Sequence, residues 1–120
     1  MDENDKRIQG YLDAIINTLT TRDDNHLREL LIILLRMEIN EDREGSLYNL
    51  CVTVWEKINK KPSVRFNAFR MILKIARKHP DLSQEVLLLT QNQYMNSLSP
   101  TAKRSIFKMI KKLYPQIFSV

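Results

Sequence analysis

The chain has 120 residues, enough for one hydrophobic core but too few for two, and its 43% hydrophobic and 28% charged residues are typical of a globular protein. Only two glycines and four prolines are present, too few for the many tight turns of an all-β protein. The net charge of +5 hides a division, because residues 1–60 carry 8 basic and 12 acidic side chains whereas residues 61–120 carry 11 and 2.

Three helices are predicted in the first half, where apolar residues recur at three- and four-residue steps. They span about 8–19, about 24–37 with Asp24 or Asn25 as the cap, and about 43–58. Acidic residues from Glu41 to Glu44 stand at the N-terminal end of the third, where the helix dipole favours them. The three apolar stripes are Ile8, Leu12, Ile15, Ile16 and Leu19; Leu30, Ile33, Leu34 and Met37; and Leu47, Leu50, Cys51, Val54 and Ile58.

A fourth helix is predicted from about Pro62 to about Lys78. Pro62 suits its first turn, where a missing N–H costs no intrahelical hydrogen bond, and Pro80 marks its end. Its apolar stripe consists of Val64, Ala68, Met71, Ile72 and Ile75.

Two further helices complete the chain. One spans about 82–95, with Asp81 as its cap, although the run Thr90–Asn92 consists of poor helix formers. The last begins after Ser99 as N-cap, with Pro100 at its first position, and Pro115 stops it. Tyr94, Met95 and the tail Tyr114–Val120, which contains Ile117 and Phe118, are expected to form an apolar end that is either a cap on the core or a docking surface.

The fourth and last helices are near copies at an offset of 38 residues. Counting back another 38 residues from Pro62 gives Asp24, at the start of the second helix. The chain therefore divides into three helix pairs, over about 3–38, 43–79 and 81–115, and this pattern predicts an all-α solenoid of six helices. The offset superposes Pro62 on Pro100, Phe69 on Phe107, Met71 on Met109, Ile72 on Ile110 and Lys74 on Lys112.

The stretch PSVRFNAF, residues 62–69, resembles the start of the second helix of HEAT repeats, where a Pro-led turn precedes Val-Arg and a small residue follows. The third copy has Ala102-Lys103 in place of Val-Arg, and the first copy keeps Asp24, Leu27, Arg28 and Leu30. The resemblance implies a short right-handed stack of antiparallel helix pairs, with first helices on the convex side and second helices lining the concave side. It also implies that Arg65 braces the turn against an acidic side chain.

The repeat also aligns positive charges on the second helix of each pair. Arg36, Lys74 and Lys112 occupy equivalent positions, so a regular stack places them in one row, and Arg70 and Lys108 form a shorter row beside it. Almost no acidic residue compensates them, so the cations form either an ordinary solvated helix face or a surface that attracts polyanions. The basic face is completed by Arg77, Lys78, Arg104 and Lys111.

No catalytic arrangement is visible. The chain has no Gly-rich phosphate loop, no nucleophile motif and no ligand spacing for a metal, since His26 and His79 stand alone. We therefore expect no enzyme activity, cofactor, metal or small-molecule substrate, and interpret the chain as a scaffold whose basic concave face recognises an acidic protein segment. Sequence-independent nucleic-acid binding by the same face is the alternative. End-to-end association of the acidic half of one copy with the basic half of another also stays open.

The remaining features predict a compartment and two packing roles. One cysteine, Cys51, precludes an internal disulfide and fits a reducing compartment, and it lies on an apolar stripe as a core thiol. The apolar run Leu30–Leu35 is too short for a membrane span, and the acidic start MDEND lacks the features of a signal peptide. We therefore expect a cytoplasmic protein without membrane contact, in which Trp55 serves packing rather than base stacking.

Overall fold

The computed structural model describes residues 3–21 and 23–115, which form seven α-helices and one 3-10 helix without a strand in those ranges. The all-α prediction is confirmed. The helices are α1 (Glu3–Thr21), α2 (Asp24–Leu35), α3 (Glu41–Glu56), α4 (Pro62–Ala76), the 3-10 helix η1 (Pro80–Leu82), α5 (Ser83–Leu88), α6 (Asn92–Met95) and α7 (Pro100–Leu113).

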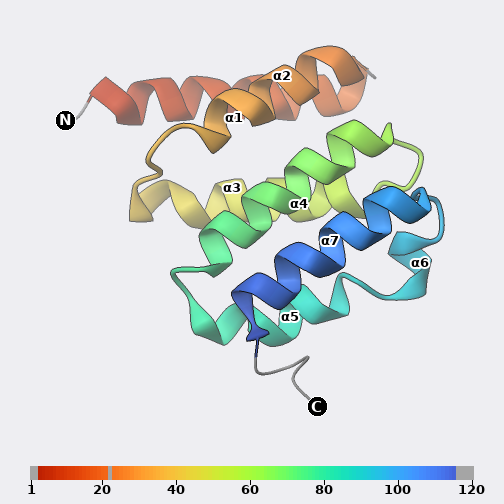
Figure 1. Ribbon diagram of the computed structural model, residues 1–120. Helices are drawn as coiled ribbons and strands as arrows, with labels where there is room; N and C mark the ends of the chain where they lie inside the picture. The colour runs from red at the N-terminus through yellow and green to blue at the C-terminus, as the bar shows by residue number, and fades with distance from the viewer. Residues whose placement is uncertain (1–2, 22, 116–120) are drawn as a thin grey trace.

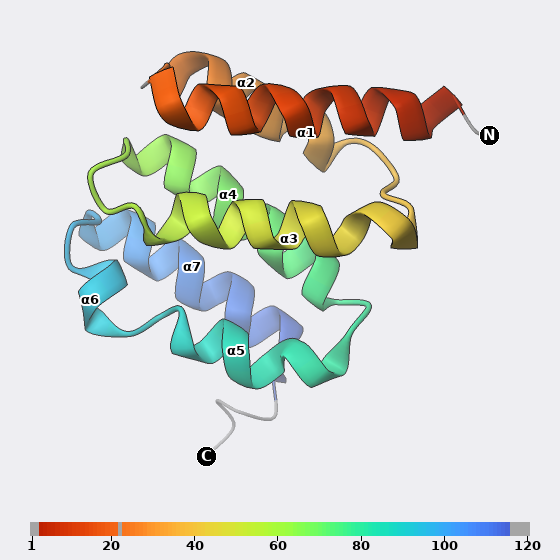
Figure 2. The ribbon, with the colours of Figure 1, turned by 180° about the vertical axis from the view of Figure 1, so that it is seen from behind.

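The helices stack as antiparallel pairs in two layers, as in a short α-solenoid. One layer contains α2, α4 and α7, which face the viewer in Figure 1, and the other contains α1, α3 and α5, which face the viewer in Figure 2. The helix α4 contacts both α2 and α7 within its layer and α3 in the other. It is therefore the central helix of the described chain.

The N-cap of α2 is Asp23, rather than Asp24 or Asn25 as predicted. The Asp23 carboxylate accepts a hydrogen bond from the backbone N–H of His26 at 3.1 Å. Asp24 instead accepts hydrogen bonds from Lys60 Nζ at 3.1 Å and from the backbone N–H of Lys61 at 3.2 Å. Partial burial opposes ionisation, but these donors outweigh it and lower the pKa of the Asp24 carboxyl. Asp24 thus ties α2 to the loop before α4.

The helix α4 starts at Pro62 and buries its predicted stripe. All five stripe residues are at most 3% exposed. Burial extends beyond the stripe to Phe69, whose ring centroid lies 4.7 Å from that of Trp55 on α3. The helix contacts neighbours on three sides, so more of its circumference is apolar than an amphipathic surface helix requires.

The predicted helix over 82–95 is broken, which raises the count from six helices to seven. Asp81 does not cap it but lies inside η1, and α5 ends at Leu88. Thr90 Oγ donates a hydrogen bond to the carbonyl of Leu87 at 2.6 Å, so its side chain occupies an acceptor near the helix end. The chain then turns and resumes as α6 at Asn92. The weak helix formers of this run explain the break.

Three residues assigned to apolar stripes are exposed. Ile16, Ile33 and Ile58 are 50%, 40% and 55% exposed, and Leu31 is buried on α2 where the pattern had favoured Ile33. At the other end, Ser99 caps α7 as predicted, its hydroxyl accepting from the N–H of Ala102 at 3.1 Å. Tyr114 is buried, whereas the side chain of Leu19 and residues Ile117 and Phe118 lie outside the described residues.

Candidate binding groove

A groove of about 650 Å³ lies between α4 and α7 and reaches the end of α2. We call it the basic groove, because its polar lining is entirely cationic. Its eight lining residues are Leu35, Arg70, Leu73, Lys74, Arg77, Met109, Lys112 and Leu113. The α4 members recur at steps of three and four residues, so they share one face of that helix.

The basic groove brings together four of the predicted basic residues, Arg70, Lys74, Arg77 and Lys112. Arg70, Arg77 and Lys112 are exposed. The Arg77 and Lys112 side chains form no hydrogen bond or ion pair with any described residue, and Arg70 donates only to the neutral Asn67 amide, at 3.3 Å. These three side chains are available to an anion.

Lys74 has a second role that its sequence position did not predict. Its Nζ donates to the backbone carbonyls of Leu35 at 2.8 Å and Met37 at 2.6 Å, at the C-terminal end of α2. These are carbonyls that a helix end leaves without intrahelical donors, and a cation there also complements the helix dipole. Burial lowers the pKa of the Lys74 ammonium, and the positive charge of Lys78 lowers it further, whereas the negative charge of Glu38 raises it. Lys74 is therefore a cap on α2 rather than a free, solvated cation.

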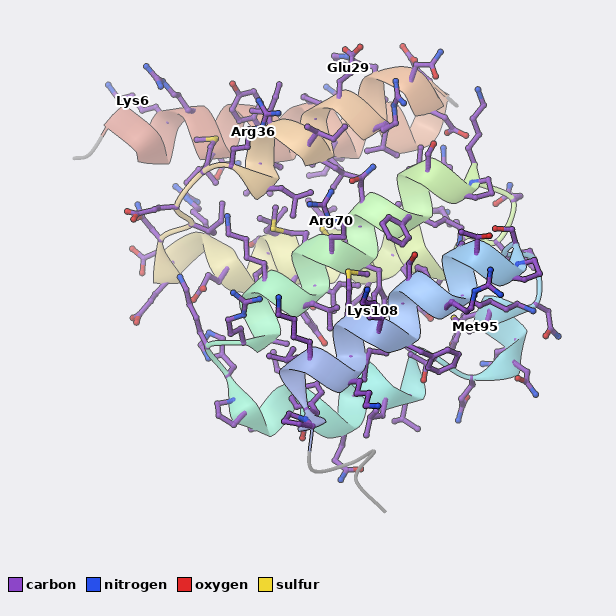
Figure 3. All side chains as sticks on the ribbon, viewed as in Figure 1. Lys6, Glu29, Arg36, Arg70, Met95 and Lys108 are labelled. Carbon is purple, nitrogen blue, oxygen red and sulfur yellow. The ribbon has the colours of Figure 1, made fainter. Side chains whose placement is uncertain are left out.

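Arg36 does not join the groove. It lines a separate depression of about 540 Å³ with Arg7, Tyr11, Ile33, Met37 and Glu38, none of which lines the basic groove. Figure 3 shows Arg36, Arg70 and Lys108 on the layer formed by α2, α4 and α7. The predicted three-membered row is thus split, and only its α4 and α7 members line one cavity.

The other predicted residues lie outside the basic groove. Lys78 forms an ion pair with the buried Glu44 carboxylate of α3 at 3.4 Å, and His79 Nε2 lies 3.1 Å from the same carboxylate. The expectation of uncompensated charge is therefore wrong at Lys78. On α7, Arg104, Lys108 and Lys111 are exposed without lining the groove.

Arg65 braces the fold, but its partners are carbonyls and a hydroxyl rather than the expected acidic side chain. It is 1% exposed, and its Nε donates to the Trp55 carbonyl at 2.8 Å. Its two terminal nitrogens donate to Ser97 Oγ at 2.9 Å and to the Tyr94 carbonyl at 2.5 Å. The guanidinium also lies 4.5 Å from the ring centroid of Trp55. Arg65 thus fixes the α5–α7 segment to the middle helix pair.

Trp55 and Cys51 have the packing roles predicted for them. Trp55 is buried, and its Nε1 donates to the Leu89 carbonyl at 2.8 Å. Cys51 is buried, and burial raises the pKa of its thiol. Over residues 3–21 and 23–115, no group of three or more His, Cys, Asp or Glu side chains is placed to hold a metal ion. No helix among the same residues has the length and apolar character needed to cross a membrane.

The sequence pattern missed the apolar base of the groove, which consists of Leu35, Leu73, Met109 and Leu113. The repeat contained a signal for this base, because it places the apolar side chain of Met109 at the position of Met71. In the structure Met71 is fully buried, whereas Met109 is only half-buried. The 38-residue offset superposed Met109 on Met71 without assigning it a role. Periodicity alone could not show that the described helices around α7 leave the Met109 side chain half-covered.

Comparison with known proteins gives one match. The family model of the HEAT repeat domain matches residues 2–113, nearly the whole chain. No curated protein and no solved structure matches. The match agrees with the paired helices of the structure and with the PSVRFNAF stretch at the start of α4. The chain belongs to the HEAT repeat family.

Proposed function

We propose that the chain is a non-enzymatic binding module whose basic groove holds an acidic segment of a partner protein. HEAT repeats are typically scaffolds that mediate protein interactions, which supports the general class. The observation that carries the ligand's chemistry is the lining of the groove, where four basic residues and no acidic residue surround an apolar base.

The cations suit carboxylates in particular. Arg70 lies on α4 and Arg77 is its C-cap, seven residues further along the chain, which corresponds to about 10 Å along a helix axis. Each guanidinium can bind a carboxylate through two parallel N–H donors, and such charge-assisted pairs are stronger than hydrogen bonds between neutral groups. Lys112 adds a point charge from α7.

An acidic protein segment fits the groove better than nucleic acid does. Half of the lining residues are apolar, and a phosphate backbone gains nothing from such contacts. None of the eight lining residues is aromatic, so unpaired bases have no ring to stack on within the groove. A protein segment with apolar as well as acidic side chains uses both parts of the lining.

A charge-reversed variant tests the proposal. Arg70→Glu, Arg77→Glu and Lys112→Glu are combined, with Lys74 retained because it caps α2. The control combines Lys6→Glu, Arg28→Glu and Lys57→Glu, which have the same effect on net charge at exposed positions outside the groove. Figure 3 shows Lys6 on α1, away from Arg70. Binding of a fluorescent glutamate-rich peptide is measured by anisotropy, with thermal unfolding as a check on the fold.

We expect the groove variant to lose at least about tenfold in affinity, since each pair with an exposed cation contributes up to about 1 kcal/mol, and the control to lose much less. Equal losses in both variants would reduce the effect to net charge and contradict the proposal. Tighter binding of the wild type to a single-stranded oligonucleotide than to the peptide, with a steep dependence on salt, would favour nucleic acid instead.

A further inference from the structure

The basic groove has two zones that differ in depth. Leu73 is buried at its base, and Leu35, Met109 and Leu113 are half-buried. The cations Arg70, Arg77 and Lys112 are exposed and therefore lie toward the rim. A ligand that fills the groove must carry apolar side chains at its centre and negative charges at its edges.

The two sides of the rim belong to different helices. Arg70 and the C-cap residue Arg77 come from α4 and its end, and Lys112 comes from α7, which packs beside α4. Negative charges on only one side of a bound segment would leave one of these helices without a partner. The ligand therefore needs acidic side chains on both flanks of its apolar face.

This arrangement distinguishes a helix from an extended segment. In an extended segment, successive side chains point to opposite faces, so residues that alternate with the inserted ones point away from the groove. In an amphipathic helix, the side chains that flank the apolar stripe point sideways, toward both walls. Resting on the proposed function, we infer that the partner segment is an amphipathic helix with an apolar stripe flanked by Asp or Glu, bound between α4 and α7.

Two peptides of identical composition test the inference. Both contain eighteen residues of Glu, Ala and Leu, in numbers chosen to match; one has leucines at steps of three and four residues, and the other has them scattered. We expect the striped peptide to bind the wild-type protein at least about tenfold more tightly, which corresponds to about 1.4 kcal/mol. Its far-UV circular dichroism should gain helix on binding, because repelling glutamates weaken the free helix.

A substitution in the apolar base of the groove tests whether the preference for the striped peptide arises there. Met109→Gln keeps the charge and approximate size of the side chain but makes the base polar, whereas Phe107→Gln changes an exposed position of α7 outside the groove. Met109→Gln should reduce the preference for the striped peptide below about threefold, and Phe107→Gln should leave it unchanged. Both variants are compared with wild type by thermal unfolding.

The outcomes separate this inference from the proposed function. Equal affinity of wild type for both peptides, or tight binding without a gain of helix, overturns the inference and leaves acidic recognition in place. Failure of both peptides to bind overturns the proposed function as well. If Met109→Gln fails to fold, the comparison of the two peptides on the wild-type protein still decides the result.

Discussion

Helices α4 and α7 share a sequence pattern but differ in burial. Ten residues of α4 are buried, against only Ile106 and Ile110 on α7. Phe69 is fully buried, while its equivalent Phe107 is 43% exposed. The reason is position in the stack, because α4 lies between α2 and α7, whereas α7 is the last described helix of its layer and packs beside α4. A repeat pattern thus specifies which face turns inward, and the number of neighbouring helices decides how deeply it is buried.

The same difference in burial shapes the basic groove. Met71 of α4 is fully buried, whereas Met109 of α7 is half-buried and lines the groove. On α7, the last described helix, apolar side chains such as Met109 and Leu113 are therefore only half-covered by the described residues. On this protein they are bordered by cations, so the change from α4 to α7 leaves an apolar base with a basic rim.

The largest expected effect is at the centre of α4. Ala68 is fully buried, so Ala68→Asp places an unpaired carboxylate in the core at a cost of several kcal/mol, against a typical total stability of about 5–15 kcal/mol. We expect loss of the cooperative thermal transition, measured by far-UV circular dichroism. Thr101→Asp, at an exposed position in the first turn of α7, is the control and should melt like wild type. A cooperatively folded Ala68→Asp variant would show that α4 is not the central helix.

Truncating the equivalent phenylalanines sharpens the comparison. Phe69→Ala removes a ring that packs on Trp55 and should lower the free energy of unfolding by about 3–5 kcal/mol. Phe107→Ala removes a ring that is nearly half exposed and should cost less than about 1 kcal/mol. Urea unfolding of both variants measures the difference. Similar costs would mean that Phe107 is covered in solution.

Local rules of sequence account for much of this fold. Proline at the first helical turn and the Ser99 cap place the starts of α4 and α7, and apolar periodicity places their inner faces. The rules fail where several residues compete for one role. Asp23, Asp24 and Asn25 can all cap a helix, and the choice of Asp23 leaves Asp24 to bind Lys60, 36 residues away. Such a contact depends on tertiary packing that no local pattern contains.

The candidate site was predictable in charge but not in shape. The repeat aligned Lys74 with Lys112, and both line the basic groove. Periodicity could not reveal that Lys74 reaches the end of α2, because that contact depends on the distance between neighbouring helices. Nor could it separate Arg36 from the groove: α2 ends at Leu35, which lines the basic groove, whereas Arg36 directly after it lines the other depression.

The next comparison is between Arg65 of α4 and Lys103 of α7, which occupy equivalent positions after the first turn of each helix. Arg65→Ala should lower the free energy of unfolding by about 2–4 kcal/mol, because it removes the donors of the buried Trp55 carbonyl and the part-buried Tyr94 carbonyl. Arg65→Lys should also destabilise, since an ammonium cannot replace the planar fork of donors. Lys103→Ala at the equivalent position of α7 should have no measurable effect. Chemical denaturation measures all three, and a neutral Arg65→Ala would show that its hydrogen bonds do not stabilise the fold.

The smallest expected difference in stability is between substitutions of the aligned lysines Lys74 and Lys112. Lys74→Met keeps the aliphatic stem but removes two hydrogen bonds to the end of α2, and should lower the free energy of unfolding by about 1–2 kcal/mol. Lys112→Met should leave thermal stability unchanged, because this exposed side chain has no partner among the described residues, and should weaken binding of an acidic peptide. Thermal unfolding and fluorescence anisotropy on both variants therefore give opposite rankings if one lysine serves stability and the other serves binding. A loss of stability in Lys112→Met equal to that in Lys74→Met would mean that α7 caps α4 as α4 caps α2, and the groove would then have one free cation fewer.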